Sequence, residues 1–184
     1  MDDGFLIRQV LGGNRNAFRL LVIRYQRTLF RFLGGMGFEA AAAEELAQEA
    51  FLRAYRSLAE YDPGKAKFSS WLFTIAKHLA LNEAARSHRR VPHLDWQEQG
   101  SEGELRAPSP SPQEALEKAE RGRRVRQAIQ KLPDFLRGTL VLAYLRELSM
   151  QDIADIESIS VGTVKSRISR GKELLRATLA ESEE

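Results

Sequence analysis

The segment 148–176, LSMQDIADIESISVGTVKSRISRGKELLR, constrains the fold more than any other part of the chain. Ser149 and Asp152 have the serine-x-x-acid spacing that caps the start of a helix. After a turn at 157–159, Ser160 stands where it can cap a second, longer helix. A short helix, a tight turn and a longer helix together have the layout of a helix-turn-helix, whose second helix enters the DNA major groove.

The second helix of this motif has one apolar face and several polar ones. Val161, Val164 and Ile168 fall near one side at helical spacing, and Leu175 continues that side. A basic amphipathic helix can be only a solvated face, and charge alone does not separate that interpretation from DNA binding. The short capped helix and the tight turn before it favour DNA binding. The hydroxyl and basic side chains left for contact with DNA are Thr163, Lys165, Ser166, Arg167, Ser169, Arg170 and Lys172.

Helical periodicity continues through the rest of the chain, and no stretch of useful length alternates with the period of a β-strand. Glycines at 34, 35 and 37 and the turn at 61–64 interrupt the pattern. The sequence therefore predicts an all-α protein. The expected helices cover 16–33, 40–58, 67–90, 113–131, 134–146, 149–156 and 160–180.

Residues 90–112 are the segment with the composition of a linker. They hold four of the six prolines, few apolar residues and a PSPSP run that cannot continue a helix. The segment 91–117 is net acidic, whereas the chain before and after it is net basic, as a chain that contacts phosphates would be. We therefore expect two helical domains, 1–90 and 113–184, joined by a flexible, acidic, proline-rich linker over 91–112.

Several classes of function are excluded or disfavoured. The chain has no cysteine, which excludes disulfides, thiolate zinc sites and cysteine nucleophiles. His78, His88 and His93 lack metal-ligand spacing, and no glycine pair leads into the Gly-Lys-Ser/Thr of a phosphate-binding loop. No apolar run approaches the roughly 20 residues needed to span a bilayer, and the acidic N-terminus does not have the form of a signal peptide. We expect an intracellular protein with no enzyme activity, no metal and no cofactor.

The predicted helix over 67–90 is the second informative element. Phe68, Trp71 and Phe73 begin it, and aromatic side chains beside basic groups suit single-stranded DNA, whose bases stack on them. Phe68 and Phe73 are individually better interpreted as core anchors. A histidine and an asparagine four residues apart share one face of this helix, and its basic end favours DNA binding. The polar residues concerned are His78, Asn82, Arg86, His88, Arg89 and Arg90.

Together these segments resemble bacterial RNA polymerase sigma factors of the extracytoplasmic-function (ECF) type, in the sigma-70 superfamily. AEELAQEAFLRAYRSL at 43–58 resembles conserved region 2.2, and FSSWLFTIAKHLALNEAARSHRR at 68–90 resembles regions 2.3 and 2.4. IADIESISVGTVKSRISRGKELL at 153–175 resembles region 4.2, within which GTVKSR at 162–167 is the most specific signal. The linker corresponds to the spacer that replaces region 3 in these proteins.

The resemblance implies an alternative sigma factor, located in the bacterial cytoplasm, that directs promoter-specific transcription initiation. It implies contacts with the β′ clamp and β flap of core RNA polymerase, with duplex DNA at the −35 element and with single-stranded DNA at the −10 element. It also implies control by an anti-sigma factor, which in this family is often membrane-linked, and no small-molecule substrate. Domain 1–90 then binds the polymerase clamp and melts the −10 element, and domain 113–184 recognises the −35 element.

Individual residues take roles only where they match the family motifs. For polymerase binding these are Gln48, Glu49 and Arg53. For the −10 element they are Lys67, Trp71, His78, Asn82, Arg86, Arg89 and Arg90. At the −35 element, the resemblance implies that Lys165, Ser166 and Ser169 contact base edges. It implies that Thr163, Arg167 and Arg170 contact phosphates.

Three positions depart from the family pattern. Ser158 occupies a turn position that is usually glycine, Glu157 stands where an apolar residue is common and is expected to thin the contact between the two helices, and Gly171 replaces a common alanine. A stand-alone helix-turn-helix regulator and a helical adaptor that binds only proteins remain alternatives. The segment 43–58 favours the sigma factor, because an independent regulator has no need of it.

Overall fold

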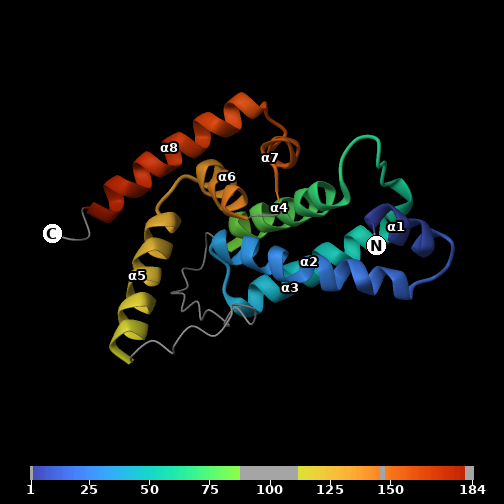
Figure 1. Ribbon diagram of the computed structural model, residues 1–184, viewed down its shortest axis with the longest axis horizontal. Coiled ribbons are helices and arrows are strands. Elements are labelled where there is room, and N and C mark those ends of the chain that lie inside the picture. The colour runs from blue at the N-terminus through green and yellow to red at the C-terminus, as the bar shows by residue number, and fades with distance from the viewer. Residues whose placement is uncertain (1, 88–111, 146–147, 181–184) are drawn as a thin grey trace.

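The computed structural model describes residues 2–87, 112–145 and 148–180. Across these ranges every regular element is a helix, which confirms the all-α prediction. The linker predicted over 91–112 lies outside the described residues except for Pro112, the first residue of a helix. Figure 1 shows the elements α1 Asp3–Leu11, α2 Asn16–Gly35, α3 Ala40–Arg56, the short 3-10 helix η1 Leu58–Glu60, α4 Phe68–Ser87, α5 Pro112–Gln130, α6 Asp134–Tyr144, α7 Met150–Glu157 and α8 Val161–Ala180.

Among the described α-helices, α1 is the one that the sequence pattern does not predict. Its apolar face, formed by Leu6, Ile7 and Val10, is buried against the rest of the N-terminal helices. At its start Asp3 accepts a hydrogen bond from the hydroxyl of Tyr25 on α2. Burial and this carboxylate raise the pKa of Tyr25 well above its ordinary value, so the hydroxyl stays a donor that fixes α1 to α2.

Helices α1 to α4 enclose the core of the N-terminal half. Phe68 and Phe73 on α4 are each 1% exposed, which confirms their interpretation as core anchors. The Phe73 ring meets Phe32 of α2 edge to face, with ring centroids 5.5 Å apart. The buried inner face of α4 fixes its orientation and leaves His78, Asn82 and Arg86 exposed on the outer side.

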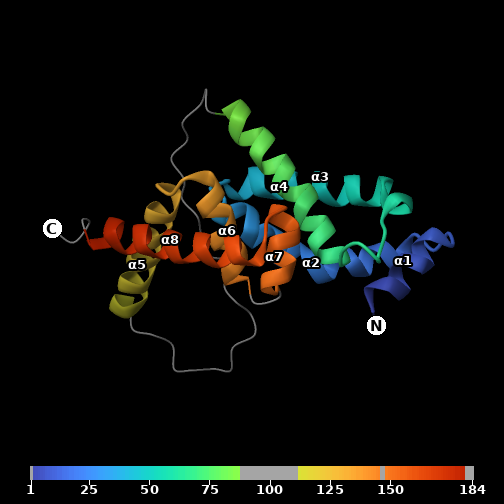
Figure 2. The ribbon, with the colours of Figure 1, turned by 90° about the horizontal axis from the view of Figure 1, so that it is seen from above.

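The two halves of the chain pack against each other. Helix α7 lies across α4, and α6 meets the end of α2, as Figures 1 and 2 show from two directions. A Cβ added at Gly35 would lie 2.6 Å from Cγ1 of Val141 on α6, so a glycine is required for this close approach. Gln130 Nε2 donates to the Gly35 carbonyl at 3.4 Å, and Arg137 Nη1 donates to the Met36 carbonyl at 3.4 Å.

Candidate nucleic-acid and polymerase interfaces

The turn between α7 and α8 is built by local hydrogen bonds. Ser149 Oγ accepts from the Asp152 amide at 3.1 Å, while the Ser149 amide donates to Asp152 Oδ2 at 2.8 Å, which confirms the predicted capping box. Ser158 ends α7 in the left-handed conformation, with φ 55° and ψ 44°. Ser160 Oγ then accepts from the Thr163 amide at 3.1 Å and caps α8 as predicted. The two helices therefore have the helix-turn-helix geometry expected from the sequence.

Helix α8 presents a polar face to solvent. Val164 and Ile168 are buried beneath it, as the spacing predicts. Ser166 Oγ donates to the Thr163 carbonyl at 2.9 Å, and Thr163 is half-buried beside the cap. Hydroxyl and cationic side chains therefore face outward over the first turns of the helix, where a recognition helix meets base edges. The exposed polar residues of this face are Lys165, Ser166, Ser169 and Arg170.

Arg167 differs from the other −35 candidates because it is held within the protein. Its guanidinium donates to Glu157 Oε2 at 3.1 Å and lies 5.3 Å from the centre of the Phe135 ring. Glu157 was expected to thin the contact between α7 and α8. Instead its buried carboxylate links the two helices through Arg167.

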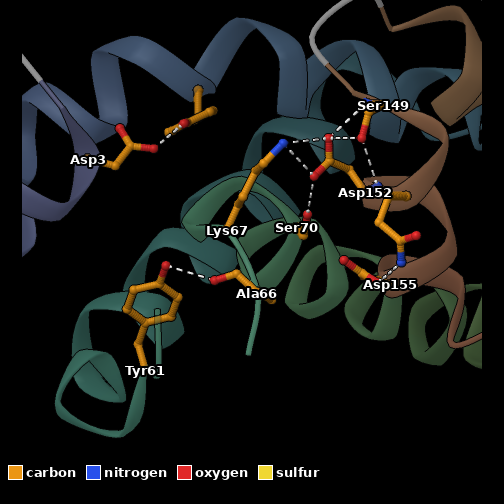
Figure 3. Close-up of polar contacts among 10 residues, drawn as sticks. Asp3, Tyr61, Ala66, Lys67, Ser70, Ser149, Asp152 and Asp155 are labelled. Carbon is orange, nitrogen blue, oxygen red and sulfur yellow. Dashed lines mark hydrogen bonds and ion pairs between the residues drawn. The ribbon is translucent and has the colours of Figure 1, made fainter. Parts of the chain in front are cut away.

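The candidate residues for the −10 element lie along α4 and the loop before it. The Trp71 ring stacks at a tilt against Tyr61, with centroids 5.1 Å apart, and is half-buried. The Tyr61 hydroxyl donates to the Ala66 carbonyl at 2.9 Å and folds the loop back on itself, as Figure 3 shows. Further along the helix the exposed candidates are His78, Asn82 and Arg86. Arg89 and Arg90 lie outside the described residues.

A polar strip runs along one side of α4. It consists of Lys67, directly before the helix, and two residues on the helix that were missed from the sequence, Ser70 and Lys77. Lys67 Nζ lies 3.1 Å from Asp152 Oδ1 and Ser70 Oγ donates to the same oxygen at 3.3 Å (Figure 3). Lys77 Nζ lies 3.3 Å from Glu157 Oε2. These three positions are three and seven residues apart, a spacing that places them on one side of a helix. This spacing is the signal in the sequence from which they could have been identified.

The carboxyl group of Asp152 on α7 is the acceptor that Lys67 and Ser70 of this strip share. Burial raises the pKa of Asp152, but hydrogen bonds from Ser149 and the Lys67 ammonium outweigh burial and hold that pKa below its ordinary value. The carboxylate is therefore charged at neutral pH. It completes the capping box of its own helix and contacts α4 at the same time.

The candidate polymerase contacts lie on one stretch of α3. Arg53 Nε lies 2.6 Å from Glu49 Oε1, and Gln48 Nε2 donates to Glu44 Oε1 at 3.3 Å. Gln48 and Arg53 are exposed and Glu49 is half-exposed. This row of polar groups is accessible to another protein.

Other kinds of site find little support in the described ranges. Among residues 2–87, 112–145 and 148–180, no cluster of three or more histidine, aspartate or glutamate side chains has an arrangement that could hold a metal ion. Within the same residues, no helix combines the length and the apolar character needed to cross a membrane.

Comparisons with known proteins match both halves of the chain. Residues 21–91 match the family model of sigma-70 region 2, and residues 122–175 match that of sigma-70, region 4. The ECF RNA polymerase sigma factor SigW of Bacillus subtilis (strain 168) is 38% identical over 180 residues, which are 94% of this chain and 94% of the relative. The ECF RNA polymerase sigma-E factor of Escherichia coli (strain K12) is 33% identical over 180 residues, 95% of this chain and 93% of the relative.

A solved structure shows the same fold over nearly the full length. CnrH, solved in complex with the cytosolic domain of CnrY, superposes with a TM-score of 0.71 at 25% sequence identity. The superposition covers 97% of this chain and 97% of CnrH.

Proposed function

The chain belongs to the ECF sigma factors of the sigma-70 family, and on that premise we propose which faces of its helices carry out each step of promoter-directed initiation. As an ECF sigma factor it binds core RNA polymerase and directs initiation at specific promoters. The region 2 match over 21–91 argues against a stand-alone helix-turn-helix regulator, which needs no polymerase-binding region.

The exposed polar face of α8 supports recognition of the −35 element and is the observation on which the assignment most depends. Lys165, Ser166 and Ser169 are proposed to contact base edges from the major groove. Thr163 and Arg170 are proposed to hold phosphates. Arg167 is also proposed to contact a phosphate. For this its guanidinium must either break its hydrogen bond to the Glu157 carboxylate or contact the phosphate and the carboxylate at the same time.

The outer face of α4 is proposed to hold the melted −10 strand. Trp71 offers a ring for base stacking, and extruding a base costs a few kcal/mol that such a pocket must recover. Cations and amides along the helix supply contacts to the backbone and to the bases. The proposed contacts are Lys67, Trp71, His78, Asn82, Arg86, Arg89 and Arg90.

Polymerase binding is assigned to α3. Gln48, Glu49 and Arg53 form an accessible row whose Glu49–Arg53 pair is already ordered in the free chain, and we propose that they meet the β′ clamp. We also propose domain boundaries at 1–90 and 113–184, with a linker over 91–112, and we propose that the second domain contacts the β flap.

CnrH was solved with the cytosolic domain of CnrY, and we propose that an anti-sigma factor likewise controls this chain.

The chain itself is proposed to carry out no covalent chemistry and to act in the cytoplasm.

The decisive experiment is reconstitution with core RNA polymerase on genomic DNA of the source bacterium, followed by sequencing of transcript 5′ ends. We expect a small set of start sites that share −35 and −10 elements and that core polymerase alone does not use. Tight binding of the isolated chain to duplex sites, without promoter-directed transcription, would instead support a stand-alone regulator.

A further inference from the structure

The exposed ring of Phe135 on α6 has a specific partner on α8. Phe135 is 54% exposed and lies outside the buried core, which α6 joins through Leu140, Val141 and Leu142. The guanidinium carbon of Arg167 lies 5.3 Å from the centre of the Phe135 ring, within the range of a cation–π interaction. Burial therefore does not explain an aromatic side chain at this position, whereas the contact with Arg167 does.

Arg167 is held by two groups of different kinds. Its Nη1 donates to Glu157 Oε2 of α7 at 3.1 Å, and the Phe135 ring of α6 attracts its positive charge through π electrons. A guanidinium has five N–H donors, of which this hydrogen bond accounts for one. The Arg167 side chain is 23% exposed, so a further acceptor can reach it from solvent. Its position is therefore fixed from two sides while donors remain for a third group.

The two partners differ in their effect on the local charge. The Glu157 carboxylate offsets the charge of Arg167, and a second carboxylate in place of the ring would repel a phosphate. The Phe135 ring carries no net charge, so it supports the cation and leaves its attraction for phosphate in place. A neutral aromatic support therefore suits an arginine that contacts phosphate and carboxylate at the same time.

We propose that Phe135 is a positioning residue for recognition of the −35 element. Its ring holds the Arg167 guanidinium beside Glu157, so that the remaining N–H groups donate to a DNA phosphate. An aliphatic side chain could occupy the same place but would not attract the cation. The inference rests on the phosphate contact proposed above for Arg167.

Tyr144, also on α6, provides a matched control. Its ring is 60% exposed, and Lys172 Nζ of α8 lies 6.0 Å from the ring centre. Tyr144 follows Phe135 by nine positions, which at 3.6 residues per turn places the two rings on opposite sides of α6. Tyr144→Leu therefore removes a contact of the same kind without affecting Arg167.

The measurement is competition binding of polymerase holoenzyme, reconstituted with each full-length variant, to a duplex promoter mapped by the reconstitution described above. Phe135→Leu should weaken binding about two- to fivefold, the strength of an exposed cation–π pair. Phe135→Trp should bind at least as tightly as the unmodified chain, because tryptophan is the aromatic side chain that binds cations best. Tyr144→Leu should leave the affinity unchanged.

Two results of this measurement would overturn the inference. One is normal binding by Phe135→Leu, and the other is binding by Phe135→Trp that is as weak as that of Phe135→Leu. The midpoint of thermal unfolding should change little in these variants, because the side chain at position 135 is exposed. The comparison therefore reports on the cation–π contact and not on loss of the fold.

Arg167→Gln separates failure of this inference from failure of the proposed function. It should weaken binding about tenfold and reduce the slope of log affinity against log salt by about 0.9, as expected for one lost phosphate contact. Adding Phe135→Leu to Arg167→Gln should cause no further loss, because the ring acts through Arg167. A further two- to fivefold loss would overturn the inference and leave the role of Arg167 intact. An unchanged slope in Arg167→Gln would refute the phosphate contact and this inference with it.

Discussion

Gly171 of α8 packs against Leu140 of α6. A Cβ added to Gly171 would lie 3.6 Å from both δ-carbons of Leu140 and 3.9 Å from its Cβ, which is ordinary van der Waals contact. Gly171 is buried in the middle of a helix, where glycine costs backbone entropy. The packing of the recognition helix on α6 therefore tolerates alanine at this position.

The substitution Gly171→Ala is expected to raise the free energy of unfolding by about 1 kcal/mol, the difference in helix propensity between the two residues. Urea denaturation followed by circular dichroism measures this change. Gly35→Ala is the matched control, because its Cβ would collide with Val141 instead of fitting. Loss of stability in Gly171→Ala would show that α6 and α8 pack too tightly for a methyl group.

The contribution of Asp152 to stability is expected to vanish in acid. Because the folded pKa of Asp152 lies below its ordinary value, its stabilising effect is complete above about pH 4 and is lost as the pH falls through the lowered pKa. The difference in unfolding free energy between the unmodified chain and Asp152→Asn should therefore be constant from neutral pH to about pH 4 and shrink below it. Asp155→Asn, on an exposed position of the same helix, should show little difference at any pH.

The local features of the fold could be predicted from the sequence because they depend on neighbouring residues. The Ser149–Asp152 capping box joins residues three positions apart, and its motif is visible in the sequence. The left-handed residue at the end of α7 follows from the turn position of Ser158. Helix α1 was missed because its apolar residues, Leu6, Ile7 and Val10, form too short a run to be distinguished by periodicity alone.

The contacts between the two halves could not be predicted in this way. Lys77 and Glu157 form an ion pair although they are far apart in the sequence. Taken alone, Lys77 has the pattern of a solvent-exposed lysine, and Glu157 is only a departure from the apolar residue common at its position. Helical periodicity identifies which face of an element is apolar, but it does not identify the partner of a polar side chain. The same reason explains why Ser70 was missed, since the Asp152 carboxylate to which it donates is 82 positions away in the sequence.

Two substitutions on α8 should separate base recognition from phosphate contact. Lys165→Ala is expected to cost about 1–3 kcal/mol on the correct −35 sequence and to relax discrimination at one base pair. Arg170→Ala should weaken binding to all sequences similarly and reduce the salt dependence by about one counterion. Competition binding of polymerase holoenzyme to −35 variants at several salt concentrations measures both. Equal sequence dependence in the two variants would contradict the assigned roles.

Loss of the polar pair on α3 should weaken polymerase binding without affecting the fold. Gln48→Ala/Glu49→Ala removes accessible side chains, so the midpoint of thermal unfolding should change little. Affinity for core RNA polymerase, measured by fluorescence anisotropy of labelled sigma factor, should fall about tenfold or more, as for central interface residues. Glu45→Ala, another exposed acid on α3, serves as the control. Unchanged affinity in the double variant would place the polymerase interface elsewhere.

With serine at position 158 the folded chain is expected to be less stable than it would be with glycine. Its φ of 55° and ψ of 44° bring the Cβ close to the following carbonyl, which costs an L-residue about 1–2 kcal/mol. Glycine avoids that cost but loses about 0.5–1 kcal/mol of backbone entropy on folding. Ser158→Gly should therefore stabilise the chain by up to about 1.5 kcal/mol in urea denaturation.

The same turn provides its own control. Ser158→Val places a β-branched side chain in the left-handed region and should destabilise the chain relative to serine. Ser158→Gly should leave −35 binding unchanged, because the turn keeps its hydrogen bond from the Ile159 amide to the Ala154 carbonyl at 3.0 Å and the exposed face of α8 is not altered. Lower stability in the glycine variant would mean that the serine side chain contributes more than the strain it introduces.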